Sequence, residues 1–154
     1  MRIALSADHR GSSIVKALQD KLAREGHQAE VIGDCAGTAC DYPERAFDVA
    51  TAVSQNKYDA GILVCGTGIG MSIAANKVKG VRAAVAHDEL TAELSRAHNN
   101  ANILCMSGDL LGQRLIEKIV DVWLKTPFEG GRHARRIHKI SAIEEGRNLA
   151  DVQE

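Results

Sequence analysis

Cys65 stands directly before the glycine-rich segment Gly66-Thr67-Gly68-Ile69-Gly70 and directly after the apolar run 60–64. That order predicts a buried strand that ends in a thiol, followed by a glycine turn into a helix over residues 70–78. The N-terminus of a helix offers free backbone N–H groups and a positive dipole end, which favour bound anions and the thiolate form of cysteine. Cys65 is therefore a candidate base or nucleophile beside an anion-binding turn. The alternative is a small, buried and inert cysteine.

Polar residues also follow other predicted strands. Asp8 and His9 follow the first strand, and His87 follows the fourth. Because ligands of parallel sheets bind beyond the carboxyl ends of the strands, we expect Asp8, His9 and Cys65 to meet in one crevice. Residues 98–99, a histidine and an asparagine, end a predicted helix ahead of the fifth strand and are expected to place a proton donor and an amide near that crevice. A structural role is the alternative for this histidine, since a helix C-terminus stabilises an imidazolium.

Arg132 and Arg136 are four residues apart, a spacing that places both guanidinium groups on one face of a helix. Two such groups can clamp a phosphate through paired hydrogen bonds. The alternative is a solvated basic face, because further basic residues lie nearby.

The elements that position these residues alternate along the chain. Predicted strands cover 2–6, 28–32, 60–64, 81–86 and 103–106, and predicted helices cover 12–25, 44–55, 70–78, 89–98, 111–124 and 134–146. Repeated strand–helix units predict an α/β fold with a five-stranded parallel sheet, helices on both faces and an extra C-terminal helix. Ser12 or Ser13 is expected to cap the first helix, and Pro43 to lie in the first turn of the second. A polar loop is expected over 34–42.

The length predicts one domain over residues 1–154. Segment 127–154 contains no strand of its own, so we expect it to pack on the body or to reach across a dimer. The net charge of −1 and the aromatic content of 3% argue against nucleic-acid binding, and no apolar run is long enough to span a membrane. The four cysteines lack metal-type spacing and no signal peptide is expected, so reduced thiols and a cytoplasmic location are predicted.

The glycine segment has a rival interpretation as a nucleotide site. A G-x-G after a strand, with Asp88 about twenty residues downstream, is similar to the dinucleotide fingerprint. Here the third glycine comes one residue early, and the motif follows the third strand. A nucleotide-binding regulatory module therefore remains as an alternative of another class.

Several motifs together resemble the ribose-5-phosphate isomerase B family, which includes the galactose-6-phosphate isomerase subunits. They are Ala-Asp-His-Arg-Gly at 7–11, Asp-Tyr-Pro at 41–43, the glycine segment continuing to 77, Ser-Arg-Ala-His-Asn at 95–99 and Gly-Gly-Arg-His at 130–133. The resemblance implies a Rossmann-like three-layer sandwich and an aldose–ketose isomerase of phosphorylated sugars that works through an enediolate. It also implies that no metal or other cofactor is used. Dimers or tetramers that share their active sites between subunits are implied as well.

The resemblance also implies roles for individual residues. Cys65 would move the proton between C2 and C1, and His98 would open the sugar ring, reaching in from a partner subunit with assistance from Thr67. The implied substrate-binding residues are Asp8, His9, Tyr42, Gly66, Gly68, Ile69, Gly70, Asn99, Asp109, Arg132 and Arg136.

Asp109 departs from the family pattern, in which an arginine usually faces the phosphate. An acid there removes a cation and adds a repulsive charge. Interconversion of ribose 5-phosphate and ribulose 5-phosphate is the expected activity. The alternative is the same chemistry on allose or galactose 6-phosphate or on a tetrose phosphate.

Overall fold

The structure, a computed structural model, describes residues 1–33, 35 and 38–152. Asp34, Ala36, Gly37 and the last two residues lie outside the described part. The predicted polar loop 34–42 is therefore described only in part.

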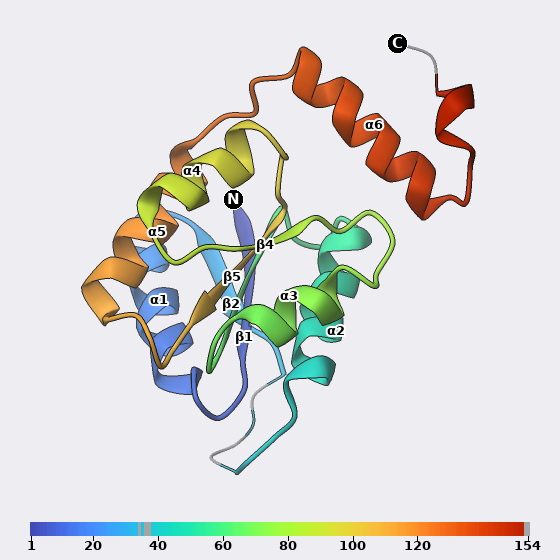
Figure 1. The fold of residues 1–154 in the computed structure, drawn as a ribbon. Coiled ribbons are helices and arrows are strands. Elements are labelled where there is room, and N and C mark those ends of the chain that lie inside the picture. Colours follow the sequence, from blue (N-terminus) through green and yellow to red (C-terminus); the bar gives the residue numbers. More distant parts are fainter. Residues whose placement is uncertain (34, 36–37, 153–154) are drawn as a thin grey trace.

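Five parallel strands form one sheet (Figure 1). They are β1 (Arg2–Ala7), β2 (Gln28–Val31), β3 (Ala60–Cys65), β4 (Ala83–Val85) and β5 (Ile103–Ser107), in the order β2-β1-β3-β5-β4. Every neighbouring pair is parallel. The predicted number and direction of strands are confirmed. β3 lies in the middle of the sheet, between β1 and β5.

Helices cover both faces of the sheet. α1 (Ser12–Arg24), α4 (Glu89–Ala97) and α5 (Gln113–Lys125) lie on one side, and α2 (Tyr42–Ser54) and α3 (Ile69–Ala75) on the other (Figure 1). The two sides correspond to two separate cores. Along β3, Ile62 and Val64 join the core with α1 and α5, whereas Leu63 and Cys65 join the core with α2 and α3. All six residues of β3 are buried, as expected for a strand covered on both faces. The predicted α/β three-layer architecture is thus confirmed.

The start of α1 differs from the prediction. Neither Ser12 nor Ser13 caps the helix; Gly11 is the N-cap residue, and the Ser12 hydroxyl instead donates to the carbonyl of Asp8 at 3.1 Å. A Cβ on Gly11 would lie 2.7 Å from the Val64 side chain, so the turn approaches β3 too closely for a larger residue. Pro43 lies in the first turn of α2, as predicted.

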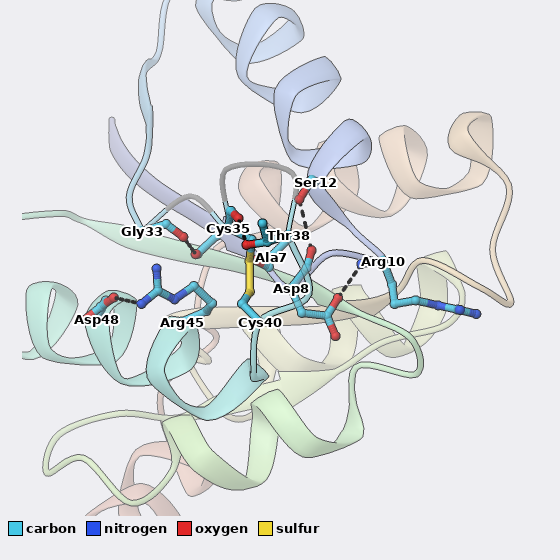
Figure 2. The surroundings of a disulfide bond; sticks show 11 residues. Ala7, Asp8, Arg10, Ser12, Gly33, Cys35, Thr38, Cys40, Arg45 and Asp48 are labelled. Carbon is cyan, nitrogen blue, oxygen red and sulfur yellow. Dashed lines mark hydrogen bonds and ion pairs between the residues drawn. A yellow bond between two sulfur atoms is a disulfide. The ribbon is translucent and has the colours of Figure 1, made fainter.

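Two of the four cysteines form a disulfide, which corrects the expectation that all four are reduced. Cys35 and Cys40 are bonded, with their Cα atoms 5.7 Å apart, within the usual range for such a bridge. Figure 2 shows the disulfide close to Ala7 and Asp8, at the end of β1. Cys65 and Cys105 remain free thiols.

The C-terminal helix α6 (Arg132–Glu144) lies outside the three layers (Figure 1). It begins two residues before the predicted helix, so Arg132 belongs to its first turn and not to a loop. Ala142 is buried, whereas Ile140 and Ile143 are exposed. A short 3-10 helix, η1 (Leu149–Asp151), follows and was not predicted. Over the described residues, no helix is both long and apolar enough to cross a membrane.

Candidate active site

The Cys65 sulfur lies at the carboxyl end of the central strand, in contact with the turn that follows. Its Sγ accepts a hydrogen bond from the backbone N–H of Gly68 at 3.1 Å, and the residue is only 4% exposed. Gly68 has a φ of +79°, and a Cβ there would lie 3.0 Å from the Met106 backbone. Glycine is therefore required both by the backbone angle and by the space. The backbone N–H of Gly68 is thus aimed directly at the sulfur.

The end of β5 and the loop after it hold the glycine turn through hydrogen bonds. The Ser107 hydroxyl donates to the carbonyl of Gly66 at 2.5 Å, and the N–H of Asp109 donates to the same carbonyl at 3.2 Å. The N–H of Gly108 donates to the carbonyl of Cys65 at 2.8 Å. These contacts fix the backbone on both sides of the thiol. Sequence reasoning did not assign Ser107 to the site, although it is the last residue of β5.

The rest of the turn becomes the N-terminus of α3. The exposed Thr67 accepts a hydrogen bond from the N–H of Ile69 at its hydroxyl, at 3.3 Å. Gly70 packs under the ring of Tyr42, since a Cβ there would lie 2.6 Å from that ring. The predicted binding residues Tyr42, Gly66, Gly68, Ile69 and Gly70 are therefore brought together around Cys65.

Asp8 and His9 join this group from β1, the strand beside β3. The N–H of Asp8 donates to the carbonyl of Val64 at 3.3 Å, which places Asp8 next to the thiol. Its side chain is 7% exposed and accepts the N–H of Arg10 at 2.9 Å (Figure 2), and His9 is exposed. β2 is added on one side of β1 and β3 on the other, so the strand order switches between β1 and β3. Ligands of parallel sheets bind at such a switch point.

Asp109 also lies at this mouth, with a partner that sequence reasoning did not assign. The Asp109 carboxylate accepts hydrogen bonds from the Nε and Nη2 atoms of Arg10, the shorter at 2.6 Å. One of its oxygens lies 3.0 Å from the position of a Cβ on Gly66. Arg10, the residue directly after His9, therefore balances the negative charge of the Asp109 carboxylate beside the turn.

The other predicted residues lie at the opposite edge of the sheet. His98 ends α4, and the carbonyl of Asn102 accepts the N–H of Gly61, at the beginning of β3. β3 has six residues, so the strand separates the two edges by about 16 Å at roughly 3.3 Å per residue. His98 and Asn99 therefore lie away from the crevice of their own chain, and the prediction that His98 reaches a site from a partner subunit stays a prediction. A helix that precedes a parallel strand ends at that strand's amino edge.

His98 lies in a cluster with the start of α6. Its ring stacks on that of His133, with centroids 4.1 Å apart and planes 4° apart. Glu129 Oε2 lies 3.8 Å from His98 Nε2 and 3.5 Å from His133 Nε2. Arg132 directly precedes His133 in the first turn of α6, and Arg136 lies one turn further on. The four predicted residues of this edge, His98, Asn99, Arg132 and Arg136, therefore form a second group.

The pKa of His133 is lowered, first by burial and then by the neighbouring His98 and Arg132. The neutral ring is thus favoured, and its Nε2 accepts a hydrogen bond from Arg132 Nε at 3.4 Å. Ligand atoms of His98, Glu129 and His133 lie within 4.8 Å of one another, as in some metal sites. Stacked parallel rings point their nitrogen lone pairs along separate planes, however, so one ion cannot lie in the planes of both rings. This arrangement does not fit a metal centre.

Cys105 is the other free thiol, on β5. It is fully buried, and burial raises its pKa far above the ordinary range for a thiol. Cys105 therefore stays protonated, and Cys65 is the candidate base.

Comparisons with known proteins agree with this geometry. A family model described as ribose/galactose isomerase matches residues 3–140. The chain is 42% identical to ribose-5-phosphate isomerase B of Escherichia coli strain K12, over 96% of this chain and 99% of that protein. It is 37% identical to D-erythrulose-4-phosphate isomerase of Pectobacterium atrosepticum, over 94% and 95% of the two chains. The crystal structure of ribose-5-phosphate isomerase B from Mycoplasma genitalium with bound ribulose 5-phosphate superposes with a TM-score of 0.91, at 45% identity over 94% of this chain and 96% of that one.

Proposed function

The chain belongs to the ribose/galactose isomerase family, and from this premise we propose that it interconverts ribose 5-phosphate and ribulose 5-phosphate. The observation that carries the proposal is the Cys65 sulfur, held by the Gly68 N–H beside Asp8 and His9. Relatives that bear this activity in their names match nearly the whole chain.

In the proposed reaction, the Cys65 thiolate removes the proton from C2 of the open-chain aldose, and the electron pair of that bond forms the enediolate. The proton then returns to C1, while a second proton passes between the O1 and O2 atoms. The N–H groups of Gly70 and Met71 lie in the first turn of α3, where helix geometry leaves N–H groups available to donate to the developing oxyanion. Loss of one such donor costs about 3–4 kcal/mol in other enzymes. Because hydrogen moves as a proton, the reaction needs no redox cofactor.

We propose that a second copy of the chain completes the site. His98, Asn99, Arg132 and Arg136 would come from the amino edge of one subunit and face Cys65 and Asp8 of the other. Two observations support this arrangement: the two groups lie at opposite edges of one sheet, and α3 exposes large apolar side chains beside the thiol. Ile69 is 52% and Ile73 59% exposed, which suits a face that packs on another subunit.

In this assembly each residue has a defined task. His98 would protonate the ring oxygen and Thr67 would assist, while Arg132 and Arg136 would hold the phosphate. His9 and Asn99 would bind hydroxyl groups. We place the enzyme in the cytoplasm, where its charged substrate is retained.

A tetrose phosphate is the second candidate substrate. The relative named D-erythrulose-4-phosphate isomerase shares 37% of its residues with this chain. The acid at position 109 also makes the phosphate end of this pocket different from the family pattern. A nucleotide-binding module has less support, because the Gly68 N–H of the glycine turn already donates to the Cys65 sulfur.

The test is isomerisation in deuterated water without added metal or nucleotide. We expect ribose 5-phosphate to yield ribulose 5-phosphate with deuterium at C1, detected by NMR. D-erythrulose 4-phosphate and allose 6-phosphate would be compared at matched concentrations. Cys65→Ser should lower kcat by about two to four orders of magnitude, as expected for loss of a general base. Turnover at the wild-type rate in that variant would refute the base assignment, and absence of turnover with every sugar phosphate would refute the proposed function.

A further inference from the structure

One peptide group connects His87 to the Cys65 sulfur. Nε2 of His87 lies 3.1 Å from the carbonyl oxygen of Thr67. The N–H at the other end of the same peptide, that of Gly68, lies 3.1 Å from Cys65 Sγ. The peptide bond is planar, so its carbonyl and N–H point in opposite directions and move together.

The direction of the first hydrogen bond follows from its chemistry. A carbonyl oxygen only accepts, so His87 Nε2 must carry the proton that is donated to Thr67. Donation to the carbonyl polarises the amide and makes its N–H a stronger donor to the sulfur, because hydrogen bonds in a chain reinforce one another.

Glycine at position 68 leaves this peptide free to turn over. A flip changes ψ of Thr67 and φ of Gly68, and glycine adopts either sign of φ at little cost. The flipped peptide would point the Thr67 carbonyl at the sulfur and repel a thiolate. The bonds from Ser107, Gly108 and Asp109 reach the carbonyls of Cys65 and Gly66 and therefore do not fix this peptide.

His87 is well placed for the task, because it follows β4 at the same edge of the sheet. Ala86, just before it, donates its N–H to the carbonyl of Cys105 at 3.1 Å, which anchors the backbone to β5. The neighbouring Asp88 carboxylate accepts the N–H of Thr91 at 2.7 Å and caps α4. Asp8, the Arg10–Asp109 pair and the titratable His9 also lie at this mouth.

We propose that His87 is a positioning residue for Cys65, which holds the Thr67–Gly68 peptide with its N–H directed at the sulfur. The consequence for turnover rests on the proposed isomerase function. The consequence for the reactivity of the thiol does not.

The test compares His87→Gln with His87→Met. Both side chains are unbranched and of similar length, but only glutamine can donate to the Thr67 carbonyl. The rate at which iodoacetamide alkylates Cys65 would be followed by mass spectrometry from pH 6 to pH 10. His27→Gln is a matched control, because His27 lies at the opposite edge of the sheet, beside the N-terminus.

We expect His87→Met to move the alkylation profile to higher pH, with about a three- to tenfold slower reaction near neutrality, the range of one hydrogen bond. His87→Gln and the control His27→Gln should both keep the wild-type profile. In turnover, His87→Met should lower kcat with little change in KM. Equal profiles for Gln and Met would overturn the proposal, whether both match the wild type or both are shifted.

The design separates this inference from the proposed function. If alkylation shifts in His87→Met alone while the wild type isomerises no sugar phosphate, the positioning role stands and the function fails. The amide proton of Gly68, observed by NMR in the wild type and in His87→Gln, gives a second measurement should His87→Met not fold. A shift of that resonance equal to the shift caused by His27→Gln would contradict a bond from position 87.

Discussion

Asp109 and Arg10 form a two-bonded ion pair across the mouth of the thiol site, between the loops that follow β5 and β1. The pair joins Asp109 to Arg10, a cation two residues after Asp8. Arg10 thus supplies a positive charge next to Asp109, but its guanidinium group already donates to the Asp109 carboxylate. The strength of this ion pair decides whether Arg10 can also bind phosphate.

Replacing Asp109 with asparagine should release Arg10 for the substrate. We expect KM for the sugar phosphate to fall about two- to fivefold with kcat unchanged, because an exposed ion pair is worth at most about 1 kcal/mol. Steady-state kinetics at low salt measure the effect, and Arg10→Ala should raise KM in the same assay. If Asp109→Asn leaves KM unaltered, the pair does not face the phosphate.

Mixing two inactive variants should restore activity if the site is shared between subunits. Cys65→Ala lacks the thiol and His98→Ala lacks the acid, yet a mixed dimer contains one complete site. Random exchange of subunits predicts about a quarter of the wild-type activity, since half the dimers are mixed and each has one of two sites intact. The activity is measured after joint unfolding and refolding, with each variant refolded alone as the control. No recovery would mean that both residues act within one chain.

The two free thiols should react very differently. At pH 8, iodoacetamide should label Cys65 and leave Cys105 unmodified, because Cys105 is fully buried and its pKa is raised. Mass spectrometry of the two peptides gives the ratio. Cys105→Ala should keep the turnover rate and lose about 1 kcal/mol of stability from the cavity it leaves. Loss of turnover in Cys105→Ala, with its fold intact, would contradict the assignment of the base to Cys65.

Acid should destabilise the protein partly through His133. Its pKa in the folded state is lowered, so below the ordinary histidine value the unfolded chain binds a proton that the folded chain resists. The stabilising contribution is complete above the unfolded pKa and is lost as the pH falls toward the folded one. His133→Gln cannot titrate, and should lose less stability than the wild type between pH 8 and pH 5.5 in urea unfolding. Parallel losses in both proteins would contradict this role.

Most of the sheet could be predicted because parallel strands covered on both faces are continuous apolar runs. The ends of some elements depend on contacts that no local pattern contains. α3 stops at Ala75, earlier than predicted, because the Asn76 side chain binds both the N–H and the carbonyl of Ala83 at 2.9 Å and turns the chain into β4. The disulfide between Cys35 and Cys40 could not be predicted either, because the spacing of these two cysteines in the sequence is not typical of a known motif.

The approach of Asp8 to Cys65 could be predicted from their positions, since Asp8 comes just after β1 and Cys65 ends β3, two neighbouring parallel strands. The sequence did not show that His98 lies at the other edge of its own sheet, because a polar residue before a strand was grouped with polar residues after strands. Only the order of helices and strands along the chain shows at which edge of the sheet such a residue lies. The Arg10–Asp109 pair could not be predicted, because residues from two distant loops show no shared period.

If a second subunit completes the site, as we propose, the division of the site between opposite edges of one sheet makes catalysis depend on the abundance of the protein. A solitary subunit would then hold the Cys65 sulfur at one edge, and its own acid and guanidinium pair would lie at the other edge, out of reach of the same substrate. By mass action, when most subunits are apart, output grows with the square of their concentration. Dilution alone then serves as an off state, with no inhibitor needed.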